Sequence, residues 1–277
     1  MNLTHRFLHG LAQEAAVLVT VQATRGSVPR EVDAWMAVFA DATVATVGGG
    51  RLELDAIAHA RRVLAQANGA DARVRYALGP SLGQCCGGEV ILQFERVTAQ
   101  DHAALAVRLT GPQTPVALFG GGHVGQALVR VLGTLPLAVT WIDSRDAVFD
   151  TGWENGSLPD NVCCEHSEPV QAAVADLPPG SRVVIMSFSH AEDLEVVAAC
   201  LERQRAQGDL PYVGLIGSRT KWASFRQRLE ARGFSAAELA RVTCPIGVAG
   251  IADKRPPVIA VAVAAQLLQV PAWPATV

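Results

Sequence analysis

The most chemically distinctive stretch of the sequence is a pair of adjacent thiols, Cys85 and Cys86, set between glycines in Leu82-Gly83-Gln84-Cys85-Cys86-Gly87-Gly88. Flanking glycines let the backbone adopt positive φ and let a bulky ligand approach closely. A thiol on such a loop can reach a metal, a sulfur donor or an electrophile, because the thiolate is the reactive form. The alternative is a glycine turn with two buried cysteines, which behave as small apolar side chains. The residues alone leave both interpretations open.

A polar loop, residues 24–30, follows a predicted strand over residues 16–21 and contains two arginines, two hydroxyls and a glycine. Arginine forks and backbone N–H groups can together hold an anion. The candidate anion-binding residues in this loop are Arg25, Ser27 and Arg30. The alternative is a solvated turn without a ligand.

A second candidate anion site is the glycine run Gly48, Gly49 and Gly50, which precedes a predicted helix from about Leu52 to Ala67. The first N–H groups of a helix have no partner within the helix and lie at its positive end, which suits a phosphate. Three glycines can equally form a tight turn, so both interpretations stand at this point.

The second half of the chain contains a dinucleotide-binding pattern. An apolar strand, Val116–Phe119, leads into a loop that matches G-x-G-x-x-G and opens an amphipathic helix. A second predicted strand, Ala138–Ile142, ends at an aspartate where such folds bind a ribose hydroxyl, and the arginine two residues later leaves phosphate-bearing ligands open as well. The residues that this pattern offers for ligand binding are Gly120, Gly122, His123, Gly125 and Asp143.

Further polar residues follow two later predicted strands, Arg182–Phe188 and Tyr212–Ile216. Polar side chains at the carboxyl ends of parallel strands line the ligand crevice of this fold class. On that ground His190, Ser218, Arg219 and Lys221 are candidate ligand-binding residues. Ser218 can alternatively serve only as the cap of the next helix.

The predicted fold class is α/β, with two domains in 277 residues of which half are hydrophobic. Residues 1–98 are expected to form a mixed α/β domain bearing the Cys-Cys loop. Residues 115–270 are expected to form a Rossmann-like domain with a parallel sheet. A turn-rich linker separates them, and an apolar helix over residues 258–268 is expected to pack between the domains.

Composition argues against several classes of function. A net charge of −3 gives no electrostatic reason to expect a nucleic-acid partner. No apolar run reaches the roughly 18 residues of a membrane span, and the first residues do not resemble a secretory signal. The six cysteines include no C-x-x-C pair, so we expect a reduced, cytoplasmic protein.

Several of these motifs together resemble the XdhC/CoxI family, the accessory proteins of xanthine dehydrogenase and related molybdenum hydroxylases. The most specific are the hexapeptide Gly83–Gly88 and the segment Gly214–Lys221. The resemblance also includes residues 24–30, Gly48–Gly50 with Glu53, residues 119–125, Ser189-His190 with Asp193, and Pro245-Ile246-Gly247. One departure is Val258, because the family usually has a glutamate there.

The resemblance implies a maturation chaperone rather than a metabolic enzyme. Such a protein binds molybdenum cofactor (molybdopterin), holds it while a cysteine desulfurase supplies sulfur, and delivers it to an apo molybdenum hydroxylase such as xanthine dehydrogenase. Cys85 would then be the metal ligand or sulfur carrier, with Cys86 a weaker candidate, because thiolate is a soft ligand. Arg25, Arg30 and the run Gly48–Gly50 would bind the phosphate. A homodimer is also expected from the family.

Two rival functions remain at this point. In the first, the chain is an NAD(P)-dependent oxidoreductase that holds its dinucleotide, or another nucleotide, at Gly120–Asp143, with His190 as the one candidate proton donor. In the second, it is a thiol-redox or sulfur-transfer protein that uses Cys85 and Cys86. Cofactor binding would separate the second rival from a cofactor chaperone.

Overall fold

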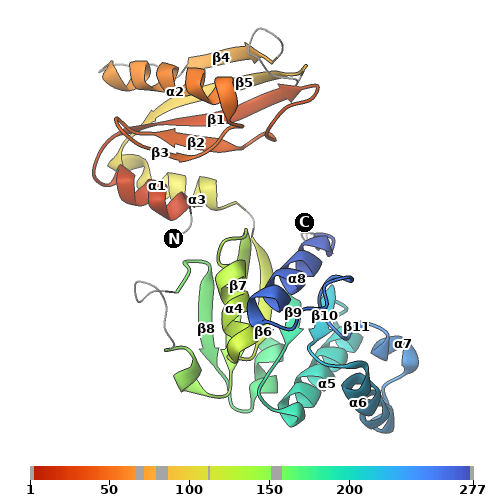
Figure 1. Cartoon of the computed structure of the whole chain (residues 1–277). Coiled ribbons are helices and arrows are strands. Elements are labelled where there is room, and N and C mark those ends of the chain that lie inside the picture. Colours follow the sequence, from red (N-terminus) through yellow and green to blue (C-terminus); the bar gives the residue numbers. More distant parts are fainter. Residues whose placement is uncertain (1–2, 67–71, 79–86, 112, 151–157, 275–277) are drawn as a thin grey trace. The chain divides into compact units, whose positions relative to one another are not determined.

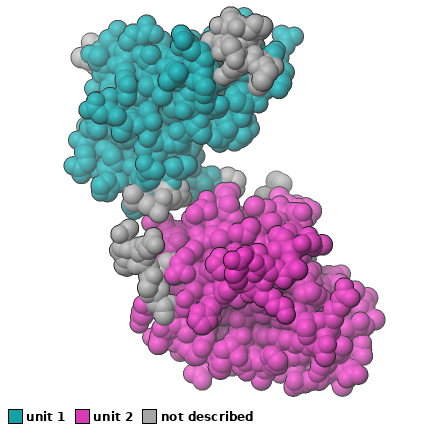
Figure 2. Space-filling view, viewed as in Figure 1, with its two compact units in different colours: residues 1–111 teal, residues 112–277 magenta. Residues whose placement is uncertain are grey.

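The computed structural model describes residues 3–66, 72–78, 87–111, 113–150 and 158–274. The chain divides into two compact units, Met1–Gly111 and Pro112–Val277 (Figure 2). Each unit has its own sheet and its own buried core.

The first unit is built on a five-stranded antiparallel sheet in the order β3-β2-β1-β5-β4 (Figure 1). The central strand alternates between two buried faces, since Val17 and Val19 belong to one core cluster and Leu18 to another. This period of two is the pattern of a sheet covered on both faces. The strands are β1 (Ala16–Arg25), β2 (Trp35–Val38), β3 (Thr43–Ala45), β4 (Ala72–Ala77) and β5 (Glu89–Val97).

Three helices cover this sheet. The long helix α2 (Gly50–Ala65) packs on the face that includes Val17 and Val19. Helices α1 (Leu3–Leu11) and α3 (His102–Thr110) pack together on the opposite face, where Phe7 and Leu105 are buried. The first unit is therefore a three-layer mixed α/β domain.

The first unit extends beyond residue 98, the boundary predicted from the sequence. A short 3-10 helix, η2 (Ala99–Asp101), follows Thr98, whose side chain and that of Asp101 form a reciprocal capping box. Helix α3 then packs back on α1, so the residues up to Gly111 belong to the first unit. The predicted boundary placed this segment outside the first domain, but the buried Leu105 anchors the segment to the core.

The second unit contains a six-stranded sheet in the order β11-β10-β9-β6-β7-β8, and every neighbouring pair is parallel (Figure 1). This confirms the predicted fold class, a mixed α/β domain followed by a Rossmann-like parallel sheet. The two strands at the edges of this sheet, β8 and β11, were not predicted from the sequence. The strands are β6 (Thr114–Phe119), β7 (Leu137–Asp143), β8 (Val162–His166), β9 (Arg182–Ile185), β10 (Tyr212–Leu215) and β11 (Val242–Thr243).

Helices cover both faces of the parallel sheet. Helix α4 (His123–Leu132) and the last helix, α8 (Pro256–Gln269), pack against each other on one face. The opposite face carries η5 (Val170–Asp176), α5 (His190–Ala206), α6 (Arg219–Ala231) and the short α7 (Ala236–Leu239). A short 3-10 helix, η3 (Asp146–Val148), follows β7.

Among the described residues no helix is both long and apolar enough to cross a membrane.

Two glycines allow α4 to begin directly at the end of β6. Gly120 has a positive φ of 123°, and a Cβ there would lie 2.2 Å from the carbonyl oxygen of Met186 just after β9. A Cβ on Gly125 would lie 2.1 Å from the carbonyl oxygen of Gly120. Only glycine permits this close approach of helix, loop and neighbouring strand.

The Gly125→Ala variant should therefore lose about 2 kcal/mol of unfolding free energy, because backbone rather than a flexible side chain blocks the methyl group. The matched control is Gly122→Ala in the same loop, where nothing lies within 4 Å of an added Cβ and φ is −71°. Urea denaturation measures both. Equal stability of the two variants would contradict the close-packing explanation.

Candidate functional site

In the first unit, the arginine loop lies against the end of the cysteine segment. A Cβ on Gly88 would lie 2.2 Å from the carbonyl oxygen of Ser27 and 2.7 Å from that of Arg25. The Gly88 carbonyl in turn accepts a hydrogen bond from the Leu78 N–H at 2.8 Å, which joins the ends of β4 and β5. Cys85 and Cys86 lie outside the described residues.

The glycine run lies beside the same arginine loop. A Cβ on Gly48 would lie 2.4 Å from Cγ of Pro29, and the Arg30 Nη1 donates to the carbonyl oxygen of Thr46 at 3.2 Å. The structure thus brings together three segments that the sequence singled out separately: residues 24–30, the run Gly48–Gly50, and Gly87–Gly88.

An internal carboxylate already binds one N–H group of the glycine run and the N–H group just before it. Glu53, one turn into α2, accepts hydrogen bonds from the N–H groups of Val47 at 3.3 Å and Gly49 at 3.1 Å, and from the Thr46 hydroxyl. The Gly48 N–H donates to the Thr46 hydroxyl at 3.1 Å. The phosphate interpretation of the sequence needs these N–H groups to be open, but those of Gly48 and Gly49 have acceptors within the chain.

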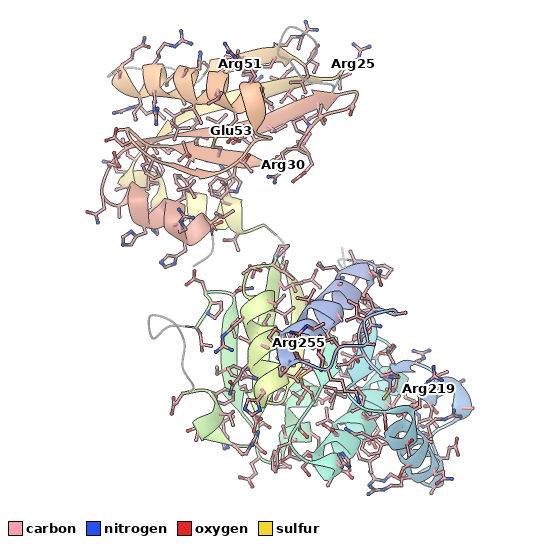
Figure 3. The ribbon with its side chains drawn as sticks, in the orientation of Figure 1. Arg25, Arg30, Arg51, Glu53, Arg219 and Arg255 are labelled. Atoms are coloured by element: carbon pink, nitrogen blue, oxygen red, sulfur yellow. The ribbon has the colours of Figure 1, made fainter. Side chains whose placement is uncertain are left out.

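The two arginines of the loop differ in how much of their guanidinium is available. Arg30 donates to Glu31 from Nε and Nη2 and to Thr46 from Nη1, so it is fixed in place. Arg25 and Ser27 are exposed, and within the described residues the Arg25 guanidinium makes no hydrogen bond or ion pair. Figure 3 shows Arg25 projecting outward from the end of β1. Arg25 is therefore the better placed of the two to contact an anion from solvent.

In the second unit, the predicted residues lie along the carboxyl edge of the parallel sheet. Gly120 and Gly122 follow β6, Asp143 ends β7, and the segment Ser218–Lys221 follows β10. His190 begins α5 beyond β9. Gly125 lies inside α4 and packs on Gly120 rather than on the open edge.

Asp143 is buried and its carboxylate is fully hydrogen-bonded. One oxygen accepts from the Gly121 N–H at 2.6 Å and from Nη2 of Arg145 at 3.0 Å. The other accepts from the backbone N–H and from Nε of Arg145, both at 2.9 Å. Asp143 therefore fixes the glycine loop and the arginine, two roles that the sequence pattern did not predict.

The Arg145 side chain links the end of β7 to the segment that follows β9, and β6 lies between these two strands in the sheet. Its guanidinium carbon lies 4.2 Å above the ring centroid of Phe188, which follows β9. The hydrogen bonds to Asp143 raise the pKa of Arg145 above its usual value, so the guanidinium is always charged. The neighbouring Ser144 also links the end of β7 to this region, because its hydroxyl donates to Glu192 of α5 at 2.7 Å. Arg145 and Phe188 were not among the predicted site residues, although the arginine two positions after Asp143 was a usable signal.

A buried ion pair holds the adjacent part of the edge. Lys221 Nζ lies 2.5 Å from Oδ2 of Asp193 and donates to the Ile216 carbonyl oxygen at 2.9 Å. The other oxygen of Asp193 accepts from the Ser187 N–H at 2.8 Å. Ser218 accepts from the Lys221 N–H at 3.1 Å and thus caps α6. Lys221 and Ser218 therefore have clear structural roles in this edge.

The remaining predicted side chains at this edge are His123, His190 and Arg219, and all three are exposed. The His190 ring lies edge-on to Phe225, with the centroids 6.3 Å apart. Cys244 follows β11 at the same edge, and burial raises the pKa of its thiol, an effect that the nearby Lys221 ammonium partly offsets. Cys244 was not among the site residues predicted from the sequence.

No group of three or more His, Cys, Asp or Glu side chains in the described part of the chain could hold a metal ion. The proposed metal ligand, Cys85, lies outside that part. The described residues therefore offer anion-binding and ring-stacking groups rather than a metal cage.

The chain is similar in sequence to one curated protein and in fold to a solved structure. Over 261 residues the chain is 27% identical to "Uncharacterized protein YqeB" of Escherichia coli strain K12, a match that spans 89% of this chain and only 42% of that protein. A solved structure described as a xanthine dehydrogenase from Bacillus halodurans superposes with a TM-score of 0.73 over 98% of this chain and 96% of that chain. At 19% identity this second likeness concerns the fold alone.

Two family descriptions match consecutive parts of the chain. Residues 11–77 match the "XdhC and CoxI family", and residues 116–267 match the "XdhC Rossmann domain". The second match alone covers more than half of the 277 residues, and the order of the two parts is the one expected from the motifs. The chain belongs to the XdhC family.

Proposed function

We propose that the chain is an accessory protein that binds molybdenum cofactor, supports its sulfuration and delivers it to an apo molybdenum hydroxylase such as xanthine dehydrogenase. Membership in the XdhC family supports an accessory role of this kind. A cysteine desulfurase would supply the sulfur, and a homodimer in the cytoplasm is the form that we expect. The cofactor is cargo in this proposal, so the chain must both hold it and release it.

The observation that carries the proposal is the convergence of three segments in the first unit. Arg25 projects from a loop whose backbone touches Gly88, three residues after Cys85. A phosphate bound to Arg25 would therefore lie near the beginning of β5, to which the Cys-Cys segment leads. An arginine for the phosphate and a thiolate for the metal or sulfur match the two chemical ends of the cofactor.

The rival oxidoreductase function receives less support from the geometry. A dinucleotide enzyme of this fold class uses the carboxylate at the end of the second strand to bind a ribose hydroxyl. Asp143 instead accepts from Gly121 and Arg145. The thiol-redox rival stays compatible with a sulfur-carrying Cys85.

The first test of the proposal is Arg25→Ala, which should weaken binding of molybdenum cofactor about tenfold, because one charge-assisted contact to the phosphate is lost. The matched control is Arg96→Ala, another exposed arginine without a hydrogen bond or ion pair in the described residues, at the opposite end of β5. Anaerobic equilibrium binding measured by cofactor fluorescence gives both constants. Equal weakening in the two variants would point to net charge rather than a phosphate site.

The second test concerns the thiols. Cys85→Ala should abolish retention of the cofactor through gel filtration, and Cys86→Ala should reduce it less. Cys163→Ala, which removes an exposed free thiol from β8, should leave retention unchanged. Molybdenum content per chain is the measurement, and circular dichroism checks that each variant is folded.

Retention of full molybdenum content by folded Cys85→Ala would remove the thiol from the proposal. Loss of retention in Cys163→Ala as well would indicate nonspecific thiol binding. The buried Cys200, whose pKa burial raises to about 12, is an internal reference that should not react with the cofactor or with alkylating reagents.

A further inference from the structure

Donors within the chain already occupy the hydrogen-bond acceptor sites of the Asp143 carboxylate. An ionised carboxylate has about four lone-pair sites. Asp143 receives four donors, one from Gly121 and three from Arg145, and its side chain is only 1% exposed. No acceptor site is left for a ribose hydroxyl, so this edge cannot recognise a ribose through Asp143 in the way usual for a dinucleotide fold.

Arg145 supplies hydrogen-bond donors beside Asp143, at the carboxyl end of β7. Of its five N–H donors, Nε and one from Nη2 bind Asp143, and the other three have no acceptor among the described residues. The side chain is 40% exposed, and its ion pair with Asp143 fixes the direction of the guanidinium. A preorganised fork of this kind binds the oxygens of a phosphate with little loss of entropy.

Phe188 supplies a planar surface beside that fork. The residue is 60% exposed, although it lies only three positions beyond the buried strand β9. The guanidinium of Arg145 stacks over this ring at 4.2 Å. Exposed aromatic rings and guanidinium planes are the groups on which heteroaromatic rings stack.

We propose that the carboxyl edge of the second unit binds a ligand in which a phosphate monoester lies near a planar heteroaromatic ring. The free donors of Arg145 bind the phosphate, and the Arg145–Phe188 pair stacks on the ring. Asp143 positions Arg145 and does not touch the ligand. The proposal uses residues of the second unit alone and does not depend on cofactor binding by Arg25 or Cys85.

Two compounds share this chemistry: the 2′-phosphoadenosine end of an NADP-type dinucleotide, and the pterin phosphate of molybdenum cofactor. An unphosphorylated ribose, as in NAD, lacks the group that Arg145 would bind. A purely structural Arg145–Asp143 pair would explain the buried carboxylate. It would not require an exposed ring beside three N–H donors that have no acceptor in the part of the chain that the structure describes.

Calorimetric binding of the full chain to NADP⁺ and NAD⁺ tests the inference, because these ligands differ only in the 2′-phosphate. Isolated molybdenum cofactor, before and after phosphatase treatment, forms the second arm. In that arm every variant also carries Arg25→Ala, so that the phosphate contact proposed for the first unit does not contribute to the ratio. The variants are Arg145→Ala, Arg145→Lys and Phe188→Ala. The control is Arg241→Ala, an exposed arginine immediately before β11, at the amino end of the sheet.

In one arm the phosphorylated ligand should bind at least about tenfold more tightly than its unphosphorylated counterpart. Arg145→Ala should reduce that ratio to about one, Arg145→Lys should restore part of it, and Arg241→Ala should leave it unchanged. Phe188→Ala should weaken both ligands of the pair about equally. The arm in which this occurs identifies the source of the phosphate.

The ratio separates recognition from structural support, because a distorted loop would weaken both ligands of a pair together. A preserved ratio in Arg145→Ala, equal binding of NAD⁺ and NADP⁺ without a phosphate effect on the cofactor, or no binding in either arm would each overturn the inference. The Arg25 and Cys85 variants report separately on the first unit, so failure here is distinguishable from failure of the proposed function.

Discussion

Internal carboxylates hold the loops of both candidate sites by accepting hydrogen bonds from backbone N–H groups. Glu53 binds the glycine run before α2, Asp143 binds the glycine loop after β6, and Asp193 binds the turn after β9. A loop N–H that is left without an acceptor in a partly buried position costs about 1–3 kcal/mol. These three side chains therefore fix the geometry of three loops at the candidate sites.

A consequence is that negative charge already occupies the positions where glycine loops usually receive an anion. The N–H groups of Gly49 and Gly121 each have a carboxylate acceptor, at 3.1 and 2.6 Å. A bound phosphate would have to displace that carboxylate or bind beside it, and like charges close together repel. In the two proposed sites, anion recognition therefore rests on arginine side chains rather than on the backbone: Arg25 in the first unit and Arg145 in the second.

Much of this architecture could be predicted from the sequence, because apolar periodicity and glycine spacing report directly on strands and helices. The β6–α4–β7 unit and the position of Asp143 followed from the G-x-G-x-x-G pattern. The pattern could not predict whether Asp143 faces a ligand or the interior, since that depends on a contact with Arg145 formed only in the folded loop. Phe188 was likewise predicted to end a buried strand, but β9 stops at Ile185 and the Ser187 N–H turns to Asp193.

The binding of loop N–H groups by internal carboxylates also affects how easily a phosphate ligand could dissociate from the proposed sites. A phosphate bound mainly by one or two exposed guanidinium groups is screened by solvent and salt, so its dissociation does not require a buried site to open. A backbone cradle with no internal carboxylate would bind the same phosphate more tightly, at a helix N-terminus. Loops whose N–H groups already bind carboxylates, beside exposed arginines, therefore favour moderate affinity, which suits the proposed delivery of the cofactor.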